Sequence, residues 1–362
     1  MLIIFYQNIL SIHQSAFIRN IAEKHDVTLV VQEKIEEPRK KHGWTVHDFG
    51  KTKIVVNPDD AVLNSFLEQK DAIHVFSGID SFPLPAKAFK IAVKNRLKMG
   101  IYSEPFNWLG WKGKLRFLKY VLLNWKYGRH LDFILAVGNR GRWCYEKTGF
   151  PKEKIFDWGY FTEMPQHDTI QYGANEILNI LFIGSIDTRK NILVLVDVCL
   201  SLTDSNPFVL NIIGTGHLEN ELREKIKTTD RINYIGSVPN NKIPEYLVKS
   251  DLLILPSVFD GWGAVVNEAL MCGTPVIASE NCGSSVLLKD GRGRVFSVKE
   301  NNLEQILCEF LQELPYGEKK RNETRNWANE NISGKAAAEY FEDIMSYTFN
   351  KRNKRPGASW ID

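Results

Sequence analysis

The amino-acid sequence predicts an α/β protein of two Rossmann-like, doubly wound domains that face each other across a cleft. Short apolar runs of strand length alternate with helical stretches in both halves of the chain. A polar stretch at 163–176 interrupts this pattern, and a new series of strands follows it, so we interpret it as the linker between domains. The length of 362 residues, 44% of them hydrophobic, is sufficient for two domains of usual size.

The first domain is expected at 1–165, where strands and helices alternate as in a doubly wound sheet. Helices are expected from about residue 14 and over 61–69. The runs of strand length are 2–6, 27–31, 54–56, 73–76, 99–102 and 133–137.

The second domain is expected at 176–335, with a more regular alternation. Its strands are expected at 177–183, 209–213, 232–234, 252–255 and 275–278. Helices are expected near 191–202, 218–227, 243–249 and 303–313. A last helix, near 334–349, precedes a basic end at 351–355 that we expect to be frayed.

Composition excludes several classes of protein. No apolar run approaches the roughly 18 to 20 residues that span a bilayer, and the start lacks the features of a signal peptide, so a cytoplasmic protein is expected. The five cysteines are scattered and lack metal-ligand spacing, which predicts reduced thiols and no metal site. The net charge is only +3, but residues 87–147 contain fourteen Lys and Arg against three acids. This excess predicts an anionic partner, for which we do not expect nucleic acid.

Four signals follow one another in the second half of the chain. They are a strand ending in glycine with basic residues after it (LFIGSIDTRKN), a strand ending in Gly-x-Gly (LNIIGTG), a short strand ending in glycine (INYIG), and an acidic, glycine-rich turn before a helix at 260–268. In this order and spacing they resemble the retaining nucleotide-sugar glycosyltransferases of family four, whose fold is called GT-B. The similarity is clearest over 177–293.

The resemblance implies roles for the acidic turn. Asp260 would hold hydroxyls of the donor sugar, and Glu268 the ribose hydroxyls of the nucleotide, because a carboxylate can accept hydrogen bonds from neighbouring hydroxyls. Gly263 would let the donor approach the bare backbone, with Gly261 and Trp262 in the same donor-binding turn. The alternative for Asp260 is a helix cap, which leaves Glu268 unexplained.

The loops after the first two strands of this half contain candidate phosphate ligands. Arg189 and Lys190 precede a helix, so their cations and the N-terminal amides suit a diphosphate. By resemblance, Lys190 matches the phosphate-binding lysine of the family, and Gly184, Gly214 and Gly216 line the nucleotide cleft. The alternatives are solvated basic residues and a plain tight turn.

The first half departs further from the family. Asn8 and His13 follow the first strand and are candidates for an acceptor site, although His13 has the alternative of an ordinary histidine at a helix start. Glu104 stands where many relatives have a histidine that touches the donor sugar, and an ion pair with nearby lysines is its alternative. By resemblance, Glu104, Lys190 and Asp260 form the catalytic set.

No Asp-x-Asp pair occurs in the sequence, so we expect no metal cofactor and a nucleoside diphosphate sugar as co-substrate. The expected acceptor is a glycan or lipid-linked glycan of surface polysaccharide synthesis. A sugar-nucleotide epimerase and a non-catalytic nucleotide-sugar or membrane-binding module are the alternative functions.

Residues 111–129 combine basic residues at helical spacing with a stripe of leucine and tryptophan. Such a helix suits the surface of an anionic membrane, where the protein is then expected to be peripheral. The alternative is that the apolar stripe belongs to the ordinary core.

Overall fold

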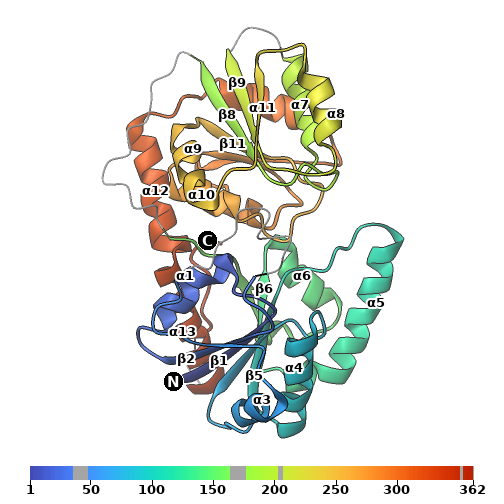
Figure 1. Cartoon of the computed structure of the whole chain (residues 1–362), viewed down its shortest axis with the longest axis vertical. Coiled ribbons are helices and arrows are strands. Elements are labelled where there is room, and N and C mark those ends of the chain that lie inside the picture. The colour runs from blue at the N-terminus through green and yellow to red at the C-terminus, as the bar shows by residue number, and fades with distance from the viewer. Residues whose placement is uncertain (36–47, 164–176, 203–206, 351–353, 362) are drawn as a thin grey trace. The chain divides into compact units, whose positions relative to one another are not determined.

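The computed structural model describes residues 1–35, 48–163, 177–202, 207–350 and 354–361, which form two compact units (Figure 1). Unit 1 takes its residues from Met1–Glu37, Thr45–Thr162 and Ser333–Asp362, and the described part of Glu163–Ile332 forms unit 2. Most of the expected linker lies outside the described residues.

A seven-stranded parallel sheet forms the centre of unit 1. Its strand order is β3-β2-β1-β4-β5-β6-β7. The chain adds β2 and β3 on one side of β1 and the later strands on the other side, so the switch point lies between β1 and β4. The strands are β1 (Leu2–Gln7), β2 (Asp26–Val31), β3 (Lys53–Val56), β4 (Ile73–Ser77), β5 (Lys98–Ser103), β6 (Phe133–Val137) and β7 (Ile155–Trp158). The central strands are buried on both faces, which explains their continuous apolar sequences.

Helices cover both faces of this sheet (Figure 1). On one face α1 (Ile12–Ile21) packs against α13 (Gly334–Asn350) around Phe17 and Phe341, whose rings meet edge to face at 5.3 Å. Gly334 is required there, because a Cβ atom would lie 2.5 Å from the backbone of Ala16. The other face is covered by α3 (Asp60–Leu67), α4 (Pro83–Asn95), α5 (Gly110–Tyr127) and α6 (Asn139–Lys147).

Unit 2 contains a six-stranded parallel sheet with the order β10-β9-β8-β11-β12-β13, which reverses between β8 and β11. Its strands are β8 (Leu178–Ile183), β9 (Phe208–Ile213), β10 (Ile232–Gly236), β11 (Leu252–Leu255), β12 (Val276–Ser279) and β13 (Gly293–Phe296). One face is covered by α7 (Ile192–Ser201), α8 (Glu219–Ile226) and α11 (Leu303–Leu311), and the other by α9 (Ile243–Lys249), α10 (Val265–Met271) and α12 (Glu318–Ile332).

The prediction of two doubly wound units is confirmed. β7, β13, α4, α6 and α12 had no expected range in the sequence. α12 is strongly polar and is attached to unit 2 by Arg321, which is 2% exposed and donates to the carbonyls of Val248 and Ser250.

The basic end is not frayed where it is described. Arg355 donates to the carbonyl oxygen of Lys152, and Trp360 is buried against Phe161. In the described ranges, no helix has the length and apolar character to cross a bilayer.

Candidate functional site

The loops that follow β8 and β11 contain the strongest candidates. These two strands flank the point where the strand order of unit 2 reverses, and open α/β sheets bind ligands outside the carboxyl ends of strands at such points. A backbone hydrogen bond of 2.8 Å from the N–H of Val258 to the carbonyl of Arg189 joins the two loops. The sequence separates these residues by about seventy positions, and the topology brings them together.

Lys190 and Asp260 contact each other directly in these loops. The Lys190 ammonium forms an ion pair with the Asp260 carboxylate, and the two side chains are only 11% and 13% exposed. The Lys190 backbone N–H also donates to Asp187 at 2.8 Å, which orients the residue at the start of α7. A pair so far removed from water is costly to break by removing one partner, because the other charge is then left uncompensated. Each of the two groups therefore holds the other in place while no ligand competes for it.

The turn that contains Asp260 is attached to the loop after β12. The N–H of Asp260 donates to Asn281 at 3.1 Å, and its carbonyl accepts from Gly283 at 3.0 Å. Gly283 is required because a Cβ atom there would lie 2.0 Å from the carbonyl oxygen of Gly261. The hydroxyl of Ser284, which is fully buried, donates to the carbonyl of Gly263 at 3.3 Å. Gly283 and Ser284 thus support the acidic turn.

The side chain of Trp262 is buried beneath the predicted donor-binding turn. It is 1% exposed, and its indole N–H donates to the Asn267 side chain at 2.8 Å. The large ring is better accommodated inside the unit, where it anchors the turn to α10, than in a water-filled cleft. Trp262 therefore positions the acidic turn, and only its backbone can belong to the site.

Gly263 has a structural role that the sequence did not indicate. Its φ of +87° is in the left-handed region, and a Cβ atom would lie 2.6 Å from the Cys282 sulfur and 2.8 Å from a methyl group of Leu255. The space beside Gly263 is thus filled by protein. The residue is glycine because of its backbone angle and its packing, in addition to any approach by a ligand.

Glu268 lies in the first turn of α10 and has an unusual electrostatic environment. Burial raises the pKa of its carboxyl to about 7, and no charged neighbour contributes to this shift. Asp260 is compensated by Lys190, whereas no cation among the described residues offsets Glu268. A desolvated carboxyl without a cation suits neutral hydroxyl donors, such as those of a sugar.

The glycines after β8 and β9 bring two loops into backbone contact. A Cβ atom at Gly214 would lie 1.8 Å from the carbonyl oxygen of Gly184, and one at Gly216 would lie 2.3 Å from that of Ile186. The Ile186 N–H also donates to Thr215 at 2.9 Å. These glycines are therefore explained by loop packing, and their expected contact with a nucleotide stays a prediction.

Arg189 differs from its neighbour Lys190 in exposure. Its side chain is 44% exposed, with a guanidinium nitrogen 3.4 Å from the Phe259 carbonyl and another 3.9 Å from Asp187. These long contacts leave the guanidinium accessible to an anion at the same pair of loops.

Two of the candidates of unit 1, Glu104 and His13, contact Tyr160, a residue that was not predicted. The hydroxyl of Tyr160, which follows β7, donates to the Glu104 carboxylate, and the Tyr160 ring stacks on His13 at 5.1 Å. His13 is in the first turn of α1 and Glu104 directly follows β5. Asn8 is half-buried after β1, and its carbonyl accepts from the Glu33 N–H. Tyr160 follows β7, a strand that was not expected from the sequence, so its position at the end of a strand did not mark it as a candidate.

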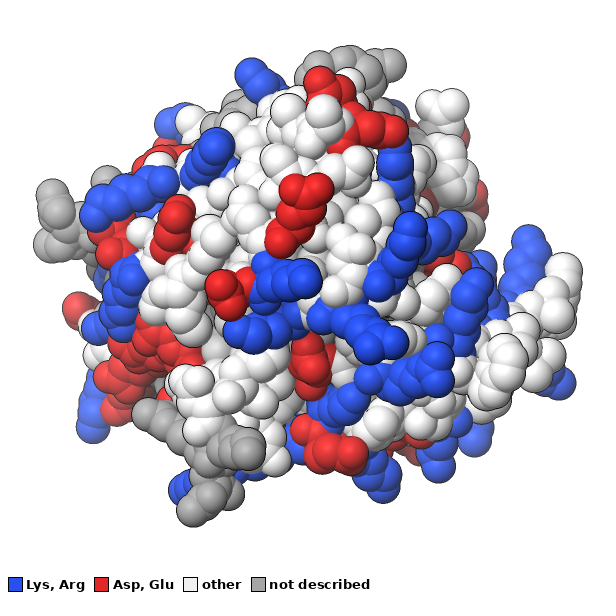
Figure 2. Space-filling model, turned by 90° about the horizontal axis from the view of Figure 1, so that it is seen from below, with Lys and Arg blue, Asp and Glu red and all other residues white. Residues whose placement is uncertain are grey.

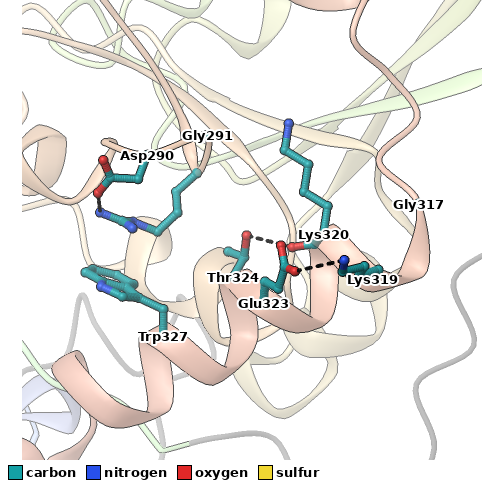
Figure 3. Close-up of a pocket in the computed structure, with 9 residues that line it drawn as sticks. Asp290, Gly291, Gly317, Lys319, Lys320, Glu323, Thr324 and Trp327 are labelled. Carbon is teal, nitrogen blue, oxygen red and sulfur yellow. Dashed lines mark hydrogen bonds and ion pairs between the residues drawn. The ribbon is translucent and has the colours of Figure 1, made fainter.

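Unit 2 also contains a hollow of about 430 Å³ (Figure 3). None of the residues predicted from the sequence lines it. The Arg292 guanidinium stacks on the Trp327 ring at 3.7 Å and contacts Asp290 at 3.1 Å. The lining residues are Asp290, Gly291, Arg292, Gly317, Lys319, Lys320, Glu323, Thr324 and Trp327.

Comparison with known proteins finds a family that resembles the second half of the chain. Residues 173–346 match the family model described as glycosyl transferases group 1. The matched region includes every candidate of unit 2, from Gly184 to Glu268.

Two curated relatives are similar to this chain. One is an uncharacterized 41.2 kDa protein in the cps region of Klebsiella pneumoniae, 27% identical over 61% of this chain. The other is the amylovoran biosynthesis glycosyltransferase AmsK of Erwinia amylovora, 30% identical over 44% of this chain. The matches span 63% and 42% of the length of these relatives.

Solved structures share the whole fold. HepE of Anabaena, in complex with UDP and glucose, superposes with a TM-score of 0.68 at 12% identity, covering 95% of this chain and 99% of HepE. The lipopolysaccharide outer core galactosyltransferase WaaB gives 0.67 at 15% identity, covering 97% of this chain and all of WaaB. The fold of this chain is GT-B, as the sequence predicted.

Proposed function

We propose that the protein is a retaining glycosyltransferase that moves a sugar from a nucleoside diphosphate sugar to an acceptor hydroxyl. The observation that carries this proposal is the contact between Lys190 and Asp260 at the switch point of unit 2. A cation and a carboxylate held together there provide one group for a diphosphate and one for sugar hydroxyls. A glycan or lipid-linked glycan of surface polysaccharide synthesis is the proposed acceptor, in keeping with the amylovoran relative.

The donor is proposed to replace the contact between the two charged groups. The diphosphate forms an ion pair with the ammonium of Lys190, and the hydroxyls of the sugar donate hydrogen bonds to the carboxylate of Asp260. Both charged groups therefore keep an interaction partner. Arg189, which is more exposed, adds a second cation. Glu268 accepts the ribose hydroxyls, and uridine diphosphate sugars are the first donors to test because HepE binds UDP-glucose.

The proposed reaction retains the configuration of the sugar. The bond between the anomeric carbon and the diphosphate oxygen breaks, and a bond from the same carbon to the acceptor oxygen forms on the same face. The acceptor's proton passes to the oxygen of the leaving diphosphate, so no separate base is required. Lys190 and Arg189 offset the charge that develops on the diphosphate, which is the reason we propose catalysis without a metal.

We propose that His13 and Tyr160, together with Asn8, lie on the acceptor side of the enzyme, and that Glu104, which Tyr160 contacts, is the catalytic carboxylate of unit 1. Glu104 directly follows β5, and the hydroxyl of Tyr160 holds its carboxylate in one orientation. An oriented carboxylate can position a sugar hydroxyl by accepting a hydrogen bond from it.

One experiment tests the proposal against its alternatives. The protein is incubated with a panel of nucleoside diphosphate sugars, with and without glycan acceptors and excess EDTA, and products are followed by NMR. We expect release of nucleoside diphosphate that persists in EDTA, and a product with the anomeric configuration of the donor. Conversion of donor without acceptor would indicate an epimerase, and tight binding without any turnover would indicate a non-catalytic module.

A further inference from the structure

Helix α5 of unit 1 presents an apolar stripe to solvent. Five large residues recur at i, i+4, i+7, i+11 and i+14, which places them on one face of the helix. Their exposed fractions range from 56% to 82%, and they are Trp111, Leu115, Leu118, Leu122 and Trp125. Tyr127 on the opposite face is buried, and Tyr120 and Leu123 pack against the core. The alternative that the stripe belongs to the ordinary core is therefore wrong.

Basic residues flank this stripe. Lys112, Lys119 and Lys126 recur every seventh residue along one side, and Lys114 lies on the other side. Residues 105–131 contain six Lys and Arg but no Asp or Glu. Lys119 reaches Asp80, outside this segment, at 2.9 Å. In Figure 2 the right-hand edge, where α5 lies, shows blue side chains around white ones.

We propose that α5 docks the protein on an anionic phospholipid bilayer. The helix of 18 residues lies parallel to the surface, with the three leucines at the acyl boundary and the lysines near the headgroups. Trp111 and Trp125, one near each end of the stripe, have the apolar ring and polar N–H that favour the interface. The apolar stripe covers only one face, so the helix lies on the bilayer and does not cross it.

The charge of the helix favours lipid over a second copy of the chain. Two α5 helices packed through their stripes would bring two sets of cations together, and 105–131 contains no acidic residue to pair with them. An anionic bilayer attracts the cations on both sides of the stripe at once, and its interior accepts the leucines. The same surface could take a lipid-linked acceptor, but docking does not depend on the proposed transferase activity.

Vesicle sedimentation of the full chain tests the proposal without any substrate. We expect the protein to pellet with phosphatidylglycerol vesicles at low salt, to be released at high salt, and to stay in solution with phosphatidylcholine. The variant Leu118→Glu with Leu122→Glu should bind at least about tenfold more weakly. A matched control, Val62→Glu with Leu200→Glu, changes two exposed apolar residues elsewhere, at 40% and 42% exposure, and should bind as the wild type does.

Fluorescence supplies a second readout on the same vesicles. Trp125, at 82% exposure, should shift to the blue on binding, and the shift should be much smaller in Trp125→Phe. Vesicle binding by the α5 double variant that equals the wild type would overturn the proposal. A concentration-dependent dimer that the same variant abolishes, without binding to vesicles, would instead assign the stripe to a second copy. Capture by an acidic polypeptide but not by vesicles would also refute it.

Discussion

Replacing Glu268 by glutamine is expected to stabilise unit 2 and to remove the pH dependence of its proposed nucleotide binding. The folded pKa is about 7 against an ordinary value of 4.5, so the folded state holds its proton more tightly than the unfolded state. The associated stability is fully present below pH 4.5 and is lost as the pH rises towards 7. At 1.36 kcal/mol per unit, the loss at pH 8 is about 3 kcal/mol. This is an upper bound, because the residue is only partly covered by protein.

Glutamine cannot ionise, so Glu268→Gln should gain up to about 3 kcal/mol over the wild type between pH 4.5 and pH 8. For a unit of this size, the gain corresponds to a rise of roughly 6 to 12 °C in melting temperature. Calorimetry of both proteins at several pH values measures the difference. The exposed glutamate Glu221 on α8, changed to glutamine, is the control and should show no such pH-dependent gain. A constant offset between Glu268→Gln and wild type across the range would refute the reasoning.

Donor binding should respond to pH in the opposite direction. In the proposed complex the ribose hydroxyls donate to the ionised carboxylate of Glu268, which is populated at about one tenth at pH 6 and nine tenths at pH 8. Affinity for a nucleoside diphosphate sugar, whose diphosphate does not titrate in this range, should therefore rise roughly tenfold. The rise should disappear in Glu268→Gln, and its survival there would remove Glu268 from the donor site.

The other predictions concern the ion pair, the acidic turn, the acceptor side and the metal. Lys190→Ala leaves a carboxylate unpaired and should cost about 3 kcal/mol of unfolding free energy in chemical denaturation, part of which returns when Asp260→Ala is added. Gly263→Ala should destabilise more than Gly236→Ala, because both have positive φ but only the first lacks space for a methyl group. Tyr160→Phe should lower kcat with an acceptor while the Kd for the donor is unchanged. A fall in donor affinity as large as the fall in kcat would contradict the assignment of Tyr160 to the acceptor side. Turnover should persist in excess EDTA, and its loss would show that a metal is needed.

Much of the fold could be predicted because both sheets are parallel and buried on both faces. Strands of this kind are nearly continuous apolar runs, and their alternation with helices is visible in the sequence. The α12 helix was missed for the converse reason, since it is too polar to show an apolar period. β13 was missed because it has only four residues, two of which are Gly293 and Arg294.

The part of the candidate site that lies within one turn and helix could be predicted, because it depends only on the spacing of residues along the chain. The separation of Asp260, Gly263 and Glu268 in one turn and helix is visible without a structure. Tertiary contacts are not, so the pairing of Lys190 with Asp260 and the link from Tyr160 to a glutamate 56 positions away could not be derived.

Which aromatic residues are buried also could not be predicted from the sequence. Tryptophan next to glycine in a turn suits either a ligand surface or an anchor, and Trp262 is the anchor. The helical spacing of α5 predicts a stripe but not which of its faces the core covers.

The most direct test of the account is isothermal titration of wild type and Lys190→Ala with the tightest-binding nucleoside diphosphate and with its nucleoside. We predict that the variant loses roughly ten- to a hundredfold in affinity for the diphosphate, as expected for a charge-assisted contact. Its affinity for the nucleoside, held through Glu268, should be unchanged. Equal affinity of both proteins for the diphosphate would contradict the central claim that the cation at the β8 loop binds the donor.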